Sequence, residues 1–156
     1  IVLLAVAANS TTSGGTVDEA ANAPLPPATT AWTQADKSLI EAVEAYHAAL
    51  TGGDIAAIES HVVTSDEFVM LEGRHSNFGW ADYRDHHLAG ELGDLGKVRF
   101  RLSFYRVLID GSLGYATFAY EVLPKDGPEM NFGRGFATAV LKLTDDGWKM
   151  LHLHTS

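Results

Sequence analysis

The chain has 156 residues, of which 46% are hydrophobic and 20% are charged, and its net charge at pH 7 is −9. This length fits one domain with a single core, and the composition is that of a folded globular protein rather than a disordered or fibrous one. Only 11 Lys and Arg residues are spread along the chain, so we expect no nucleic-acid partner. The absence of Cys excludes disulfides and leaves His, Asp and Glu as metal ligands.

Residues 1–30 differ in composition from the rest of the chain. The run IVLLAVAANS begins with seven or eight apolar residues, fewer than the roughly 20 that a membrane span needs. It is typical of the remnant of a secretory signal peptide, and the Ser, Thr, Gly and Pro residues up to Thr30 are typical of a flexible leader. We therefore predict an exported protein, periplasmic or secreted, whose folded domain covers residues 31–156. A buried first strand at residues 1–8 is the alternative.

Two helices are predicted at the start of this domain. Thr33 or Asp36 can cap the first helix, which Gly52 and Gly53 end. Apolar or aromatic residues recur at helical spacing along it, at Leu39, Ile40, Val43, Tyr46, His47 and Leu50. Asp54 caps a shorter helix with the sequence IAAIESHV, and FVMLEG at residues 68–73 is predicted as a short strand.

A third helix and four long strands complete the predicted domain. The helix covers residues 80–93, because apolar or aromatic residues recur there at spacings of three or four, at Trp80, Tyr83, His87 and Leu88, then Leu92. Strands are predicted within residues 97–111, 113–124, 132–147 and 148–155, with Gly-containing turns between them. Three helices followed by a meander of long, twisted strands indicate an α+β fold with helices on one face of a mainly antiparallel sheet.

Three stretches of the chain resemble the nuclear transport factor 2-like superfamily, in particular its SnoaL-like branch. They are FVMLEG, WADYRDHHLAGEL and GFATAVLKLTDDGWKMLHLHTS, in this order across residues 31–156. The last stretch is also similar to the association domain of calcium/calmodulin-dependent kinase II and to iota-class carbonic anhydrases. Those carbonic anhydrases carry further His and Ser residues in this motif, where the present chain has Leu151, Leu153, Thr155 and Ser156.

The resemblance implies a cone-shaped fold, in which a strongly curved sheet wraps around the helices and opens at one end onto a cavity. It also implies a homodimer that forms through the outer face of the sheet. It does not specify a reaction, because the fold is used by isomerases, cyclases, dehydratases, hydrolases and modules for binding or assembly.

Two histidines in the last strand are the first candidates for a site. Regular alternation puts Met150, His152 and His154 on one face, with the two histidines about 7 Å apart, and Leu151 and Leu153 on the other face. We expect the histidines to line the cone. They can be structural residues that form hydrogen bonds in the pocket wall, they can contact a ligand, or they can bind a metal.

His87 is the third candidate histidine, because it shares a helical face with Tyr83 and should point inward. If its helix covers the mouth of the cone, His87, His152 and His154 form a site for Zn or Cu, with Glu72 or Glu91 as a carboxylate ligand. The alternative is that adjacent histidines simply pack at the end of the helix.

Arg134 can act as a hook for a carboxylate or phosphate group if it points inward, or it can pair with Glu121 across the sheet. Trp80, Tyr83 and Tyr120 are predicted to contact a ligand together with the histidines. The leading hypothesis is an exported domain that binds a small ligand or a metal ion in a conical pocket. The alternatives are an enzyme with a pocket histidine as general base, such as an isomerase, cyclase, hydrolase or carbonic anhydrase-like enzyme, and a homo-oligomeric assembly domain.

Overall fold

The computed structural model describes residue 25, residues 27–29 and residues 31–156. The predicted signal remnant and leader at residues 1–30 therefore lie outside the described residues, apart from these four positions. Thr29 donates its backbone N–H to the carbonyl of Phe104 (2.9 Å) and its hydroxyl to the carbonyl of Tyr105 (2.9 Å). Thr29, which lies before the predicted domain boundary, is therefore in contact with the folded part.

The first two helices begin and end where capping residues predict. Helix α1 (Gln34–Gly52) starts at Thr33 with a capping box and ends at Gly53, whose φ of 73° is readily adopted only by glycine. Helix α2 (Ile55–Glu59) is capped by the Asp54 side chain, which accepts from a backbone N–H. The buried residues of α1 are those that the helical spacing predicted, namely Leu39, Ile40, Val43, Tyr46, His47 and Leu50.

The middle of the chain contains a hairpin and an interrupted helix. Strands β1 (Val69–Glu72) and β2 (His75–Phe78) pair antiparallel; β1 was predicted and β2 was not. The single helix expected over residues 80–93 consists of α3 (Trp80–Tyr83), a π-helical turn η2 (Arg84–Leu88) and α4 (Ala89–Leu95). The wider π turn adds one residue to the helix and lies in the segment that carries both adjacent histidines.

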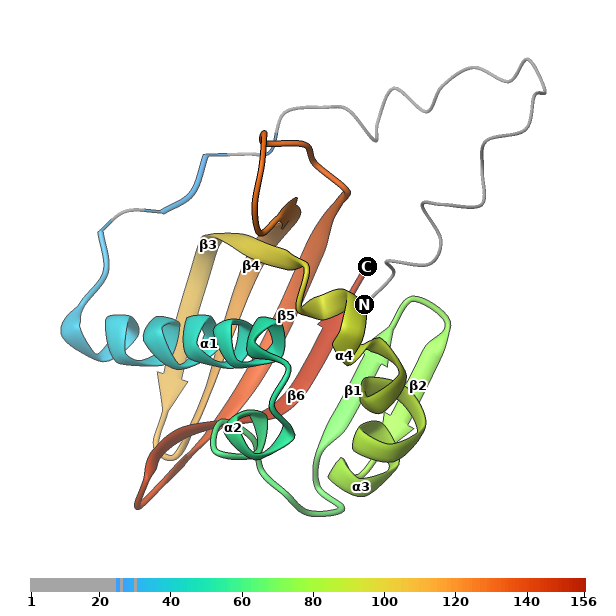
Figure 1. The fold of residues 1–156 in the computed structure, drawn as a ribbon. Helices are drawn as coiled ribbons and strands as arrows, with labels where there is room; N and C mark the ends of the chain where they lie inside the picture. The colour runs from blue at the N-terminus through green and yellow to red at the C-terminus, as the bar shows by residue number, and fades with distance from the viewer. Residues whose placement is uncertain (1–24, 26, 30) are drawn as a thin grey trace.

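Four long strands form most of a six-stranded sheet, as predicted. They are β3 (Val98–Asp110), β4 (Leu113–Pro124), β5 (Gly133–Thr144) and β6 (Gly147–Thr155), and each pairs antiparallel with the next. The strand order is β2-β1-β6-β5-β4-β3, in which only the contact of β1 with β6 is parallel. The sheet is curved and α1 lies across its concave side (Figure 1), so the structure confirms the α+β cone with a mainly antiparallel sheet.

A β-bulge interrupts the last strand. Val140 of β5 is opposite His152 and Leu141 is opposite Met150, so Leu151 has no partner on β5. Met150, before the bulge, is completely buried and faces the interior. Because of the extra residue, His152 and the residues after it face the side opposite to the one that a regular strand would give them.

The core lies between the concave face of the sheet and the helices. Its largest completely buried side chains come from both layers and include Tyr46, Tyr83, Phe68, Phe118, Leu141 and Met150. Among the described residues, no helix has the length and apolar character needed to cross a bilayer.

Candidate functional site

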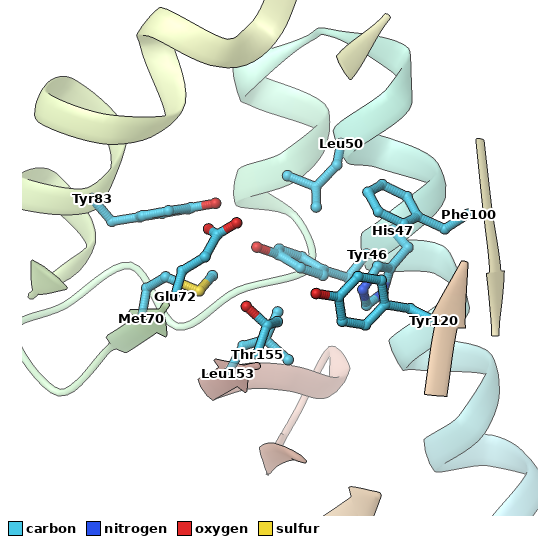
Figure 2. Close-up of a pocket in the computed structure, with 10 residues that line it drawn as sticks. All are labelled: Tyr46, His47, Leu50, Met70, Glu72, Tyr83, Phe100, Tyr120, Leu153 and Thr155. Carbon is cyan, nitrogen blue, oxygen red and sulfur yellow. The ribbon is translucent and has the colours of Figure 1, made fainter. Parts of the chain in front are cut away.

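A narrow cavity lies inside the cone, between α1 and the concave face of the sheet. The centre of a water-sized molecule can occupy about 20 Å³ of it, and the total empty space is about 370 Å³ when the open mouth and the solvent there are included. Ten residues line it: Tyr46, His47, Leu50, Met70, Glu72, Tyr83, Phe100, Tyr120, Leu153 and Thr155. Figure 2 shows that they come from α1, β1, the interrupted helix and the strands β3, β4 and β6. The site is therefore assembled from distant parts of the chain, and its wall is apolar except for a few oxygen and nitrogen atoms.

Two tyrosine hydroxyls are the most distinctive polar groups in the wall. Tyr46 and Tyr83 are completely buried, and neither hydroxyl makes a hydrogen bond of acceptable geometry in the part of the chain that the structure describes, although the two hydroxyls lie close enough to shift each other's pKa. Figure 2 shows both hydroxyls and the carboxylate of Glu72 pointing toward one another. Burial raises the pKa of both tyrosines above the usual value, so each remains a neutral O–H donor at physiological pH.

His47 is a buried neutral histidine. Its Nδ1 donates to the carbonyl of Val43 (2.8 Å), and the rings of Tyr46, Phe100 and Phe118 pack edge-on around it at 5.2 to 5.6 Å. Burial lowers the pKa of His47 to about 4, because the apolar surroundings disfavour the charged imidazolium. His47 therefore contributes an uncharged aromatic wall to the cavity.

A cluster of three ionisable side chains includes the cavity residue Glu72. Nε2 of His87 is 3.5 Å from Oε2 of Glu72 and 3.4 Å from Oε1 of Glu91, and Nδ1 of His87 is 2.9 Å from Oδ1 of Asn77. Glu72 is only 2% exposed, and the ring of His75 lies 5.4 Å from that of His87. Burial lowers the pKa of His87. The inward direction predicted for His87 is thus observed, together with both carboxylates named for it.

The last strand turns its histidines away from this cavity. Leu153 and Thr155 line the cavity, whereas His152 and His154 lie on the opposite face of the sheet because the bulge inverts the alternation. Nδ1 of His152 donates to the carbonyl of Val69 (3.1 Å), and His154 is exposed. The expectation that these histidines point into the cone is wrong, and the structure does not bring them together with His87.

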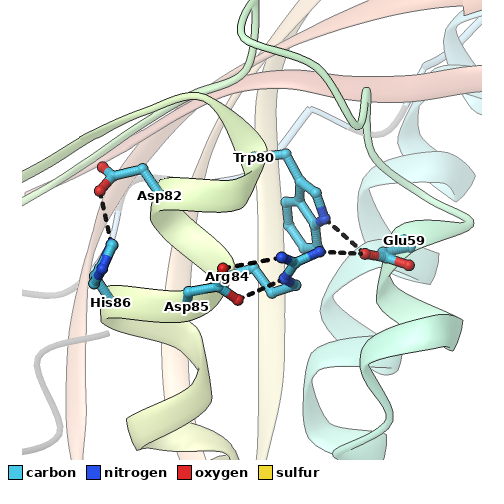
Figure 3. A network of polar contacts seen from close by, with 6 residues as sticks. All are labelled: Glu59, Trp80, Asp82, Arg84, Asp85 and His86. Atoms are coloured by element: carbon cyan, nitrogen blue, oxygen red, sulfur yellow. Dashed lines mark hydrogen bonds and ion pairs between the residues drawn. The ribbon is translucent and has the colours of Figure 1, made fainter.

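Trp80 and Arg134 also lie outside the cavity wall. The indole N–H of Trp80 donates to Oε1 of Glu59 (2.8 Å), which also pairs with Arg84 (3.4 Å), as Figure 3 shows. Trp80 therefore fixes α3 to α2 and is buried in the core. Arg134 is opposite Glu121 on the outer face of β4 and β5, so the inward orientation considered for it is not observed.

The remaining predicted residues do line the cavity. Tyr83 contributes one of the two buried hydroxyls described above, and Tyr120 extends from β4 with its hydroxyl directed at the carbonyl of Ser156 (3.4 Å). Tyr46 and Thr155 were not predicted as site residues. The signal for Tyr46 was its position on the buried face of α1, where a hydroxyl needs a partner.

The sequence model of the SnoaL-like domain matches residues 39–156, which is most of the chain. The chain belongs to the SnoaL-like family. No curated protein matches it. The matched region begins inside α1 and includes every residue that lines the cavity, so the cavity is a part of the SnoaL-like domain.

Solved structures of the nuclear transport factor 2-like superfamily share this fold. A provisionally assigned ketosteroid isomerase from Shewanella frigidimarina has 22% identity and a TM-score of 0.64, over 79% of this chain and 98% of that one. A provisionally assigned association domain of calcium/calmodulin-dependent protein kinase type II from Thiobacillus denitrificans has 16% identity and a TM-score of 0.64, over 74% and 90%. A provisionally assigned dehydratase from Streptomyces avermitilis has 19% identity and a TM-score of 0.61, over 78% and 94%. At these identities, the similarity establishes the fold of the SnoaL-like domain but not its activity.

Proposed function

We propose that this SnoaL-like domain binds a small, neutral and mostly apolar molecule that carries a carbonyl or hydroxyl oxygen. The observation that supports this most is the pair of buried hydroxyls, Tyr46 and Tyr83, that lack a partner among the described residues. A buried donor without a partner costs about 1–3 kcal/mol, and a ligand oxygen placed between the two tyrosines removes that cost.

The charges around the cavity favour a neutral ligand. Glu72 lies in the wall, and the chain has a net charge of −9. A carboxylate or phosphate ligand would meet a like charge in a poorly solvated place, whereas a ketone accepts hydrogen bonds without adding charge. We therefore propose carbonyl compounds rather than organic acids as the first ligands to screen.

Removal of either cavity hydroxyl is expected to weaken ligand binding without weakening the fold. In Tyr46→Phe or Tyr83→Phe, a small cyclic ketone should bind about tenfold more weakly, because one hydrogen bond to its oxygen is lost. The free energy of unfolding should stay the same or rise by about 1 kcal/mol, because an unsatisfied buried group disappears. Calorimetric titration with ketones and urea unfolding measure the two effects.

Tyr105→Phe is the matched control, because the hydroxyl of Tyr105 is also buried without a partner among the described residues, but lies in a groove on the outer face. It should leave ketone binding unchanged. Equal affinity of all three variants for a bound ketone, or no ketone binding at all, would contradict the proposal.

A second candidate function is acid–base catalysis on such a ligand. The observation in its favour is the 3.5 Å contact of Glu72 with His87 beside the tyrosine hydroxyls. Hydrogen bonds from Tyr46 and Tyr83 would polarise a carbonyl, and Glu72 would take a proton from the neighbouring carbon. The test is deuterium exchange at that carbon by NMR, which should slow by about 10²-fold or more in Glu72→Gln. An equal exchange rate in the variant would reject this function.

We further propose that the domain is exported and forms a homodimer through the outer face of its sheet. On this face, Phe136 and Leu108 are 50% and 51% exposed. Phe136→Asp should shift the sedimentation equilibrium toward the monomer, because it puts a charge into the apolar contact. Met130→Asp changes an apolar residue of the β4–β5 loop that is 60% exposed, and it should have no effect. A pure assembly domain would keep this dimer but bind no ketone.

A further inference from the structure

The orientation of His87 is fixed by a chain of side chains behind it. Asn77 donates from Nδ2 to Oδ2 of Asp82 (2.9 Å), which directs its Oδ1 toward Nδ1 of His87 (2.9 Å). Because Oδ1 can only accept, Nδ1 of His87 carries the proton and donates. In the neutral ring, Nε2 is then a lone pair that points toward the carboxylates of Glu72 and Glu91.

A lone pair and two carboxylate oxygens that face one another are a donor set for a cation. The cation can be a proton on Nε2 or a metal ion. A metal ion would be bound by the lone pair and by both carboxylates at once.

Two distances in the cluster match those between the ligands of a metal site. In a tetrahedral site with bonds of about 2.0–2.1 Å, neighbouring ligand atoms are about 3.3–3.4 Å apart. Nε2 of His87 lies 3.5 Å and 3.4 Å from the oxygens of Glu72 and Glu91, and the three ligand atoms all lie within 4.8 Å of one another. Asn77 behind His87 is the kind of outer partner that orients a metal-binding imidazole.

We propose that Glu72, His87 and Glu91 bind one zinc ion, with a fourth position open to water or to a ligand oxygen. This site differs from the three-histidine site predicted from the sequence, and of those histidines it uses only His87. The inference goes beyond the proposed function, because it concerns the metal alone and leaves both tyrosine hydroxyls unchanged. With zinc bound to it, Glu72 would not act as the base of the second candidate function.

The experiment is a calorimetric titration of the EDTA-treated full chain with Zn²⁺. One ion should bind per chain, and Mg²⁺ should not displace it, because the imidazole nitrogen disfavours a hard cation. His87→Gln and Glu91→Gln should weaken Zn²⁺ binding by more than about 100-fold, because each removes a ligand. Asn77→Ala should weaken it by about 10- to 100-fold, because the imidazole of His87 is then no longer held in its orientation. Circular dichroism shows that each variant is folded.

His152→Gln and His154→Gln are the matched controls and should bind Zn²⁺ as the unaltered protein does. Absence of Zn²⁺ binding by the folded protein, or unchanged affinity in His87→Gln, would overturn the proposal. A loss that follows His152 or His154 instead would place the metal on the outer face and also overturn it. Because no ketone is present in these titrations, their outcome is separate from that of the ligand screen.

Discussion

Between pH 6.5 and pH 4, His47 is expected to lower the free energy of unfolding by up to about 3 kcal/mol. Its pKa is about 4 in the folded protein, against 6.5 for an unperturbed histidine, because burial disfavours the imidazolium. The unfolded chain therefore binds a proton at a higher pH than the folded one. Stability from this residue is complete above pH 6.5 and is lost as the pH falls toward 4.

Urea unfolding at pH 7 and pH 4.5 measures this loss. His47→Phe keeps an aromatic ring between Phe100 and Phe118 but cannot take up a proton, so its stability should change much less between the two values. His154→Gln removes an exposed histidine and should keep the pH dependence of the unaltered protein. Equal pH dependence of His47→Phe and the unaltered protein would assign the acid sensitivity to other groups.

Gly135→Ala is expected to destabilise the domain by about 1–3 kcal/mol and to disturb the cavity, because there is no room for a side chain at this position. An added Cβ would lie 1.9 Å from the carbonyl oxygen of Ser156 and 2.7 Å from the hydroxyl of Tyr120. Ser156 cannot easily move, since its backbone exchanges two hydrogen bonds with Phe136 (3.0 and 3.2 Å). The Tyr120 hydroxyl must then shift within the cavity wall.

Gly133→Ala is the matched control on the same strand, because a Cβ there would meet no atom within 4 Å. It should leave the free energy of unfolding unchanged or raise it by about 0.4–1 kcal/mol, because alanine reduces the conformational entropy of the unfolded chain. Thermal unfolding of both variants, with tryptophan fluorescence as the signal, provides the comparison. A destabilisation of the same size in both would mean that loss of glycine itself, and not the contact with Ser156 and Tyr120, is responsible.

The fold was predictable from the sequence because its local signals agree with one another. Helical spacing identified every buried position of α1, and the caps at Thr33 and Asp54 marked where two helices begin. Long strands separated by Gly-containing turns identified the meander. Strand β2 was missed because HSNF has neither alternation nor β-branched residues, and it pairs only because β1 offers it an edge.

The site was predictable only in part, because its geometry depends on irregular backbone. Tyr83 and His87 were identified because they share a face of the predicted helix, whereas Tyr120 and Glu72 were named as candidates without a predicted orientation. The direction of the last strand was wrong, because Leu151 forms the bulge and a leucine carries no signal for one. His87 and Glu91 meet because they are four residues apart on one helical segment, but their contact with Glu72 requires β1 to lie beside that segment, which spacing along the chain does not encode.

The bulge at Leu151 has a consequence for how such domains vary in length. Its backbone already lies outside the ladder with β5, so removal of this one residue would leave Met150, Leu153 and Thr155 facing the interior. A homologue that is one residue shorter here would therefore keep the same interior, whereas a homologue of equal length with a regular strand would exchange its two faces. When this chain is aligned with a homologue that has a regular last strand, a one-residue gap at Leu151 aligns side chains that face the same side of the sheet. An alignment without the gap would pair His152 and His154 with residues that face the interior.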